Sequence, residues 1–295
     1  MSNPKKGTLK VIGTGITLGQ ISLESKILVE KSEKVLYCVA DAATEAFILK
    51  VNPSAESLYV FYGDDKPRRK TYNQMVERIM QCVREGFDTC AIFYGHPGIF
   101  VSPSHESITI ARSEGFNAVM LPAISSLDCL FSDLGFDPAN GCQIFEATDL
   151  LLRNRPIDIF GAVVIWQIAA TGDTGFNFKG FDCRNVPLLT KYLLQYYEPD
   201  FEVIVYEAAQ YSVCEPVIER VKLENLTQAD ITGVSTLFIP AVHRAPVHLE
   251  AIEQLGLQKA LKGKKLVPYE GPFSHPVTHF MKNNISQTVS SNEES

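Results

Sequence analysis

The N-terminal third of the chain alternates short apolar runs with amphipathic runs, and this alternation constrains the fold more than any other feature. The apolar runs predict strands at 8–12, 35–39, 58–62 and 89–94. The runs between them have helical spacing and predict helices at 18–31, 42–50 and 72–85. Strands that alternate with helices favour a parallel sheet with right-handed crossovers and helices on both faces, so we expect an α/β fold.

The pattern changes at residues 122–126, which we interpret as a linker. Ser125 or Ser126 would cap a helix that runs to Leu134. Beyond it, candidate strands at 142–145, 162–166, 202–206 and 235–239 outnumber the candidate helix near 186–197, which favours a mixed sheet.

We therefore expect three parts. They are an N-terminal α/β domain with a parallel sheet at 1–122, a C-terminal α/β domain with a mixed sheet at 123–250, and a C-terminal helix with a polar tail at 251–295. From residue 285 onward Ser, Asn, Gln and Glu dominate, a composition typical of disorder.

Charge and hydropathy exclude several classes of partner. The 27 basic and 34 acidic residues give a net charge of -7, which opposes broad contact with nucleic acid or anionic lipid. No apolar stretch reaches the roughly 20 residues of a membrane span, and the first residues lack the apolar core of a signal peptide. We expect a cytoplasmic protein that binds neither nucleic acid nor membrane.

We also expect no metal site. The seven cysteines are widely spaced and form no Cys-x-x-Cys pair. His275 and His279 are four residues apart, but Pro276 lies between them and no carboxylate flanks them. His243 and His248 are no better placed to bind a metal.

A first glycine turn follows the strand at 8–12. Gly13-Thr14-Gly15 followed by Gly19 is close to the dinucleotide-binding fingerprint, but its third glycine comes one residue late. The glycines allow either a close approach to a nucleotide-like ligand or a tight strand-to-helix turn. A dehydrogenase with Asp41 as the ribose-binding acid therefore stays open.

A second turn ends the strand at 89–94 and is the first candidate for a cofactor site. Between residues 91 and 105 an apolar strand breaks into a turn with two glycines, a proline, Tyr94 and His96. Ligands of open α/β sheets bind beyond the carboxyl ends of the strands. Tyr62, at the end of the third predicted strand, should face the same crevice as Tyr94.

The segment 59–72 concentrates aromatic and basic side chains. Lys66, Arg69 and Lys70 are typical of a solvated loop. Arg68 lies near Tyr62 and Tyr72 in the sequence, and a guanidinium beside phenols can favour phenolate and stabilise a developing oxyanion. This cluster is the candidate catalytic group.

These segments carry a resemblance. Tyr-Gly-His-Pro-Gly at 94–98 resembles the Gly-Asp-Pro-type loop of the tetrapyrrole methylase superfamily, whose members bind S-adenosylmethionine between two α/β domains. The segments 62–68, 93–105, 147–156 and 233–240 are similar to the borosin peptide backbone α-N-methyltransferases, and the similarity runs in order from about Leu9 to Leu255. His96 stands where many superfamily members carry Asp, so residue roles transfer more safely from borosins.

The resemblance implies a tetrapyrrole methylase-like fold of two α/β domains with the cofactor cleft between them. It implies an enzyme that uses S-adenosylmethionine, releases S-adenosylhomocysteine and needs no metal. The implied catalytic residues are Arg68, Tyr72 and Tyr94, with Tyr62 beside them and Tyr59 along the peptide path. The implied cofactor contacts are Tyr94, His96, Ile99, Ser125, Ser126, Gln167, Ala208, Ser235 and Thr236.

The chain departs from the fused borosin enzymes at its C-terminus. Fused members continue into a clasp region and a core peptide rich in Val, Ile and Gly, whereas this sequence ends in Gln-Thr-Val-Ser-Ser-Asn-Glu-Glu-Ser. We expect a split enzyme that acts on a separate precursor peptide as a homodimer, an arrangement that allows a heterotetramer with two precursor chains. The alternatives are a tetrapyrrole-type small-molecule methyltransferase and a non-catalytic peptide-binding module.

Overall fold

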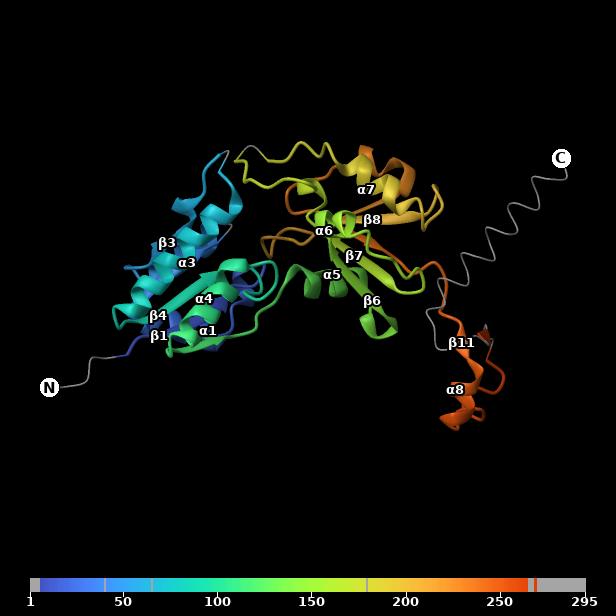
Figure 1. Ribbon diagram of the computed structural model, residues 1–295, viewed down its shortest axis with the longest axis horizontal. Helices are drawn as coiled ribbons and strands as arrows, with labels where there is room; N and C mark the ends of the chain where they lie inside the picture. The colour runs from blue at the N-terminus through green and yellow to red at the C-terminus, as the bar shows by residue number, and fades with distance from the viewer. Residues whose placement is uncertain (1–5, 40, 65, 179, 265–267, 270–295) are drawn as a thin grey trace.

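The computed structural model consists of two α/β units, each a five-stranded sheet with helices packed on it (Figure 1). These two units are called the first and the second layer below. The structure describes residues 6–39, 41–64, 66–178, 180–264 and 268–269. The first layer is blue to teal in Figure 1, and the second runs from green to orange. The expected fold class, two α/β units with helices packed on their sheets, is confirmed.

The first sheet is parallel throughout, in the order β3-β2-β4-β1-β5. Its strands are β1 (Thr8–Gly13), β2 (Lys34–Cys38), β3 (Glu56–Ser57), β4 (Asp88–Phe93) and β5 (Asn117–Met120). Its helices are α1 (Leu23–Lys31), α2 (Ala42–Val51), α3 (Arg68–Arg84) and α4 (Ser102–Ser113).

Side chains that alternate along the central strands build two separate cores. In β1, Val11 packs with the buried residues of α3 and α4, and Ile12 packs with those of α1 and α2. Successive side chains of a strand point to opposite faces, so one strand supplies both cores. The carboxyl ends of these parallel strands meet at one edge of the sheet, where ligand-binding turns collect.

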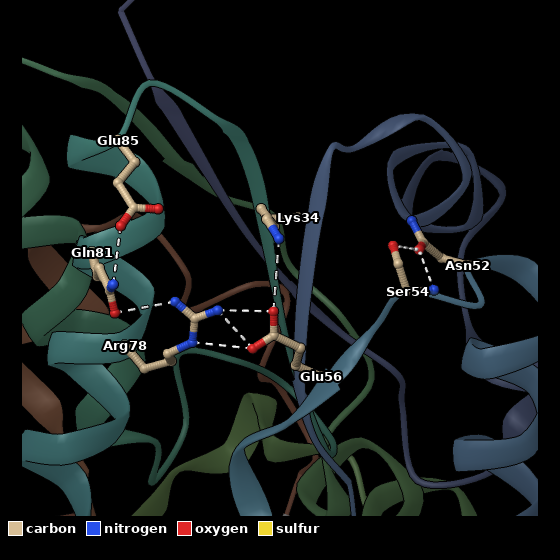
Figure 2. Close-up of polar contacts among 7 residues, drawn as sticks. All are labelled: Lys34, Asn52, Ser54, Glu56, Arg78, Gln81 and Glu85. Carbon is tan, nitrogen blue, oxygen red and sulfur yellow. Dashed lines mark hydrogen bonds and ion pairs between the residues drawn. The ribbon is translucent and has the colours of Figure 1, made fainter.

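The edge strand β3 is held by a cluster of charges between it and α3 (Figure 2). Glu56 accepts hydrogen bonds from Arg78 Nη2 at 2.7 Å and from Arg78 Nε at 3.1 Å, and Lys34 Nζ lies 3.9 Å from the same carboxylate. These side chains are partly exposed, so the pair contributes at most about 1 kcal/mol. The cluster fixes the start of the segment that leads to Tyr59 and Tyr62.

The second sheet is mixed, in the order β6-β7-β10-β8-β9. β6 and β7 are parallel, whereas β10 is antiparallel to both β7 and β8, and β9 is antiparallel to β8. Its strands are β6 (Cys142–Glu146), β7 (Ala162–Trp166), β8 (Glu202–Glu207), β9 (Val217–Lys222) and β10 (Thr236–Ile239). Its helices are α5 (Ser126–Leu134), which packs on one face, and α6 (Ala147–Leu152) and α7 (Val186–Leu193), which pack on the other.

The chain leaves the second sheet through β11 (Val247–His248) and α8 (Leu249–Gln254), which lie apart from it at the lower right of Figure 1. β11 pairs in parallel with β12 (Pro268–Tyr269). The predicted linker at 122–126 falls between β5 and α5, and the extents of the three predicted parts stay predictions. The expected disorder from residue 285, His275 and His279 lie outside the described residues. Among the helices that the structure describes, none combines the length and apolarity of a membrane span.

Three predicted elements differ from the structure. The run at 58–62 was expected to be a strand, but Leu58–Phe61 forms a 3-10 helix because the Ser57 hydroxyl accepts from the Tyr59 N–H at 3.3 Å and ends β3. The helix expected at 72–85 begins one turn earlier, at Arg68, directly after Pro67. The helix expected at 18–31 divides into a 3-10 turn at Leu18–Gln20 and α1.

Candidate functional site

A cavity of about 310 Å³ lies between the two layers and is lined by residues of both. This volume is within the roughly 300–1,000 Å³ of small-molecule sites. Most of the predicted site residues line it: Tyr62, Tyr72, Tyr94, His96, Ile99, Ser125, Ser126, Gln167, Ala208, Ser235 and Thr236. Arg68 and Tyr59 do not line it and lie at its edge.

The first wall is the turn that follows β4. The Gly95 N–H donates to the Gly15 carbonyl at 3.0 Å, and the Gly15 N–H donates back to Gly95 at 3.3 Å. A Cβ at Gly13 would lie 2.1 Å from the Gly95 oxygen, so only glycine allows the two turns to pack this closely. The glycines after β1 therefore serve turn packing, and neither Gly13 nor Gly15 lines the cavity.

The structure gives Asp41, the acid of the dehydrogenase interpretation, a role in folding. The Asp41 carboxylate accepts from the Thr44 N–H at 2.8 Å and caps α2. A side chain that satisfies the start of its own helix is explained by folding alone. No ribose contact is needed to account for an acid at this position.

The His96 ring is fixed at the cavity by its own turn. Its Nδ1 accepts from the Gly98 N–H at 2.9 Å. A Cβ at Gly98 would lie 3.1 Å from the His96 ring, so a larger residue there would push the ring. The turn predicted from the sequence thus presents Tyr94, His96 and Ile99 to one cavity.

The second wall comes from strand ends of the mixed sheet. Gln167 follows β7, Ala208 follows β8, and Thr236 begins β10. Since β10 is antiparallel to both neighbours, its start lies beside their carboxyl ends, with Thr236 opposite Tyr206. Residues that are far apart in the sequence therefore meet at one edge.

Two of the predicted serines are already engaged in local turns. Ser125 caps α5, where its Oγ donates to Asp128 Oδ2 at 2.6 Å. The Ser235 Oγ donates to Glu207 Oε1 at 2.5 Å and accepts from the Thr232 N–H at 2.8 Å. These bonds fix the backbone of both segments against the cavity.

Two of the tyrosines are held as neutral phenols. Burial, followed by the nearby Cys38 and Tyr72 side chains, raises the pKa of Tyr62. Burial first, and then Cys129 and Asp41, raise the pKa of Tyr94 to about 12. At neutral pH both phenols therefore keep their protons and can donate hydrogen bonds.

Arg68 and Tyr72 are four residues apart in α3, so they lie on one face of the helix. The Arg68 Nε donates to the Gly175 carbonyl at 3.1 Å, and its Nη1 lies 3.5 Å from Gln167 Oε1 at the cavity edge. Tyr59 is 41% exposed, with its ring 5.1 Å from that of Tyr62. The aromatic and cationic cluster predicted from the sequence is therefore assembled beside the cavity.

The sequence analysis missed an aromatic pair that joins the two layers. The ring centroids of Phe100 and Trp166 lie 4.7 Å apart, and both residues line the cavity. Phe100 has φ 58, a left-handed conformation that is unusual for an aromatic residue. The sequence signals for this pair were an aromatic residue close to the glycine turn and the single Trp at the end of a predicted strand.

The described part of the chain contains no group of three or more His, Cys, Asp or Glu side chains arranged to hold a metal ion. His248 Nδ1 accepts from the Ala251 N–H at 3.3 Å and caps α8. The cavity instead offers amide, hydroxyl, imidazole and phenol groups. These groups, together with apolar side chains such as Ile16 and Met75, suit a small organic ligand with polar and apolar parts.

Curated relatives are fungal proteins. The chain is 43% identical over 257 residues to the methyltransferase/ribosomally synthesized cyclic peptide dendrothelin A precursor of Dendrothele bispora, which covers 85% of this chain and 62% of that protein. It is 43% identical over 262 residues to the omphalotin A precursor of Omphalotus olearius, which covers 87% of this chain and 63% of that protein. A type III borosin cyclic peptide precursor of Anomoporia bombycina is also 43% identical, over 87% of this chain and 30% of that protein. The chain thus spans less than two thirds of the length of these relatives.

Solved structures share the fold at low sequence identity. Uroporphyrin-III-C-methyltransferase from Thermus thermophilus aligns with a TM-score of 0.58 and 15% identity, covering 90% of this chain and 98% of that one. Cobalt precorrin-4 methyltransferase aligns with a TM-score of 0.56 and 16% identity, covering 79% and 94%. The family model of the tetrapyrrole (corrin/porphyrin) methylases matches residues 8–227. This match covers most of the chain, and the two α/β units with a cavity between them are consistent with it. The chain therefore belongs to the tetrapyrrole methylase family.

Proposed function

We propose that this protein transfers methyl groups from S-adenosylmethionine to backbone amide nitrogens of a borosin-type precursor peptide. The observation that carries the proposal is the placement of Arg68, Tyr72, Tyr62 and Tyr94 at one cavity between the layers. The curated relatives, which are named as methyltransferases joined to peptide precursors, support the same substrate class.

The cavity fits S-adenosylmethionine in size and chemistry. The turn with Tyr94, His96 and Ile99 would hold the cofactor from the first layer, and Gln167, Ala208, Ser235 and Thr236 would hold it from the second. Ser125 and Ser126 lie at the start of α5 and line the cavity, held there by the capping box between Ser125 and Asp128. When bound, S-adenosylmethionine supplies an electrophilic methyl group on a sulfonium. No metal enters this chemistry.

The amide nitrogen is the difficult partner. Its lone pair is delocalised into the carbonyl, the same resonance that makes the peptide bond planar, so methylation requires imidate character. We infer that Tyr72, as phenolate, takes the amide proton and becomes a phenol, while Arg68 stabilises the negative charge that develops on the carbonyl oxygen. The nitrogen would then form its bond to the methyl carbon as the carbon–sulfur bond breaks and S-adenosylhomocysteine leaves. Tyr72 is the phenol that shares a helix face with Arg68, whereas burial raises the pKa of Tyr62 and of Tyr94 and suits them as hydrogen-bond donors.

Tyr62 and Tyr94 would act as donors. A protonated phenol can hydrogen-bond the carbonyl oxygen and so assist Arg68, and Tyr94 would orient the amide from the turn after β4. Holding the peptide in this geometry supplies much of the acceleration through proximity. Tyr59, exposed at the edge, would contact the peptide as it enters.

The test is a comparison of two phenol deletions. Tyr72→Phe should abolish or greatly slow release of S-adenosylhomocysteine with added precursor peptide, while calorimetry shows cofactor affinity close to wild type. Tyr196→Phe is the matched control, because Tyr196 packs against Tyr192 in the second layer. A Tyr72→Phe enzyme with the wild-type rate would contradict the assignment.

Calorimetry with S-adenosylmethionine and the methylation assay also separate the competing functions. A pure peptide-binding module would show no affinity for S-adenosylmethionine, and a small-molecule enzyme would methylate a tetrapyrrole but no peptide. We further propose that the peptide is a separate chain and that the enzyme is a cytoplasmic homodimer, with a heterotetramer formed when two precursor chains bind. Light scattering with and without peptide measures the mass of each assembly.

A further inference from the structure

A long loop of the second layer crosses to the first layer and meets Arg68. This strap, the described residues 171–178 and 180–184, connects the 3-10 turn at Ile168–Ala170 to α7. Its two ends are joined by an ion pair between Arg184 Nη2 and Asp173 Oδ1 at 2.5 Å and by a hydrogen bond from Asn185 Nδ2 to the Thr171 carbonyl at 2.7 Å. A loop closed at its base in this way projects its middle as a unit.

The far part of the strap is attached to the first layer. The Phe178 N–H donates to Asp64 Oδ1 at 3.0 Å. The Phe176 ring lies 4.6 Å from the Tyr62 ring, and the Phe178 ring lies 6.1 Å from that of Tyr59. The strap therefore spans the two layers beside the cavity.

Arg68 is held mainly by this strap. Its backbone N–H donates to the Thr174 carbonyl at 3.1 Å, and its side-chain Nε donates to the Gly175 carbonyl at 3.1 Å. The guanidinium carbon lies 5.7 Å from the centroid of the Phe181 ring. That ring is supported from behind, since a Cβ at Gly233 would lie 3.3 Å from it.

All of these partners are uncharged, which matters for the role of Arg68. Within the described residues, no carboxylate forms an ion pair with its guanidinium. The nearby carboxylates are used elsewhere: Asp173 pairs with Arg184, and Asp64 accepts from the strap backbone. Carbonyl oxygens and a π face orient a guanidinium without neutralising it, so its full charge stays available to an anionic oxygen.

We propose that the strap is the positioning element of the catalytic arginine, with Phe181 as the ring that packs on its guanidinium. This inference rests on the proposed methyl transfer, because it assigns the strap to the oxyanion-stabilising group of that reaction. Phe181 is a positioning residue: it acts through Arg68 and does not line the cavity. Loss of its ring removes the contact on the face of the guanidinium, so that only the hydrogen bonds to Gly175 and Gln167 orient it.

Two measurements test the proposal, and one of them is independent of activity. Hydrogen exchange of the Arg68 Nε–H, followed by NMR and assigned with Arg68→Lys, reports whether the strap holds the side chain. Phe181→Leu should speed this exchange and lower kcat roughly ten-fold, with the peptide KM and the cofactor affinity changing little. Phe181→Tyr, which keeps the ring, should restore both readouts.

Phe201→Leu is the matched control. It removes an equal ring in the second layer, where Phe201 stacks on Tyr197 rather than on Arg68. It should leave the Nε–H exchange and kcat near wild type. The proposal is overturned if Phe181→Leu exchanges at the wild-type rate, or if both leucine variants give the same change.

The two proposals fail in different ways. A protein that methylates no peptide would refute the proposed function, and the exchange measurement would still decide the positioning role. Wild-type exchange in Phe181→Leu alongside a normal loss of activity in Arg68→Ala would refute the strap and leave the proposed function intact.

Discussion

Gln167 combines a strained backbone with a side chain at the cavity, so its effects on stability and on binding can be separated. Its φ of 58 and ψ of 37 place it in the left-handed region. This conformation costs a residue with a Cβ about 1–2 kcal/mol, and glycine avoids that cost but loses about 0.4–1 kcal/mol more in chain entropy. Gln167→Gly should therefore be about 0.5–1 kcal/mol more stable than Gln167→Ala.

The comparison with alanine isolates the backbone, because both variants lose the amide that lies 3.5 Å from Arg68 Nη1. The stability difference corresponds to a Tm about 2 °C higher for the glycine variant, measured by thermal denaturation. Both variants should bind S-adenosylmethionine about five-fold more weakly in calorimetry, the value of one lost hydrogen bond. Equal Tm values would refute the strain argument, and wild-type affinity in both variants would refute the assignment of Gln167 to the cofactor.

Three further predictions concern charge and protonation. Arg68→Ala should lower kcat by about 10²–10³-fold in a methyl-transfer assay. Arg69→Ala, which removes an exposed charge from the next residue, should leave kcat near wild type. Equal losses of kcat in the two variants would show that net charge alone is responsible. The pKa of Tyr94 is raised from 10.0 to about 12. The stability that its protonated phenol contributes is therefore complete below pH 10 and is lost as the pH rises through 12. Over that interval the free energy of unfolding of wild type should fall by up to about 2.7 kcal/mol relative to Tyr94→Phe, as measured by denaturant titration. A constant difference between these two proteins would contradict the pKa shift. Glu56→Gln should lower the free energy of unfolding by at most about 1 kcal/mol, and less at high salt, since its pair with Arg78 is partly exposed; a salt-independent loss would contradict the electrostatic account.

The central strands could be predicted because a strand that is buried on both faces is a continuous apolar run in the sequence. β7, for example, is a continuous apolar run whose observed bounds equal the predicted ones. β9 carries no such run, since it is an edge strand with mostly exposed side chains. β5 buries one residue and α4 follows the glycine turn after β4, so neither stood out from the loops around it.

The apolar run at Leu58–Tyr62 shows where periodicity fails. Five apolar residues after a glutamate and a serine resemble a buried strand, but Tyr59 and Val60 are exposed in the structure. The Ser57 hydroxyl accepts from the Tyr59 N–H and so favours a tight helical turn over a continued strand. Such local competition between side chain and backbone is not visible in hydropathy.

The turn residues of the site were accessible to sequence reasoning, and the strap was not. Tyr94 and His96 follow a buried strand, and parallel strands bring their ends together. Phe181 and Gly175 are more than a hundred positions from Arg68, as the sequence separation of 107 between Gly175 and Arg68 illustrates. Only the crossing of a loop between the two layers brings them together.

Fragment-ion mass spectrometry of the precursor peptide after incubation with enzyme and S-adenosylmethionine tests the central claim most directly. We predict methyl groups on main-chain nitrogens of the peptide, formed by wild type and lost in Tyr72→Phe. Methyl groups confined to side chains or to the termini, or a peptide left unmodified while S-adenosylmethionine binds, would contradict the account.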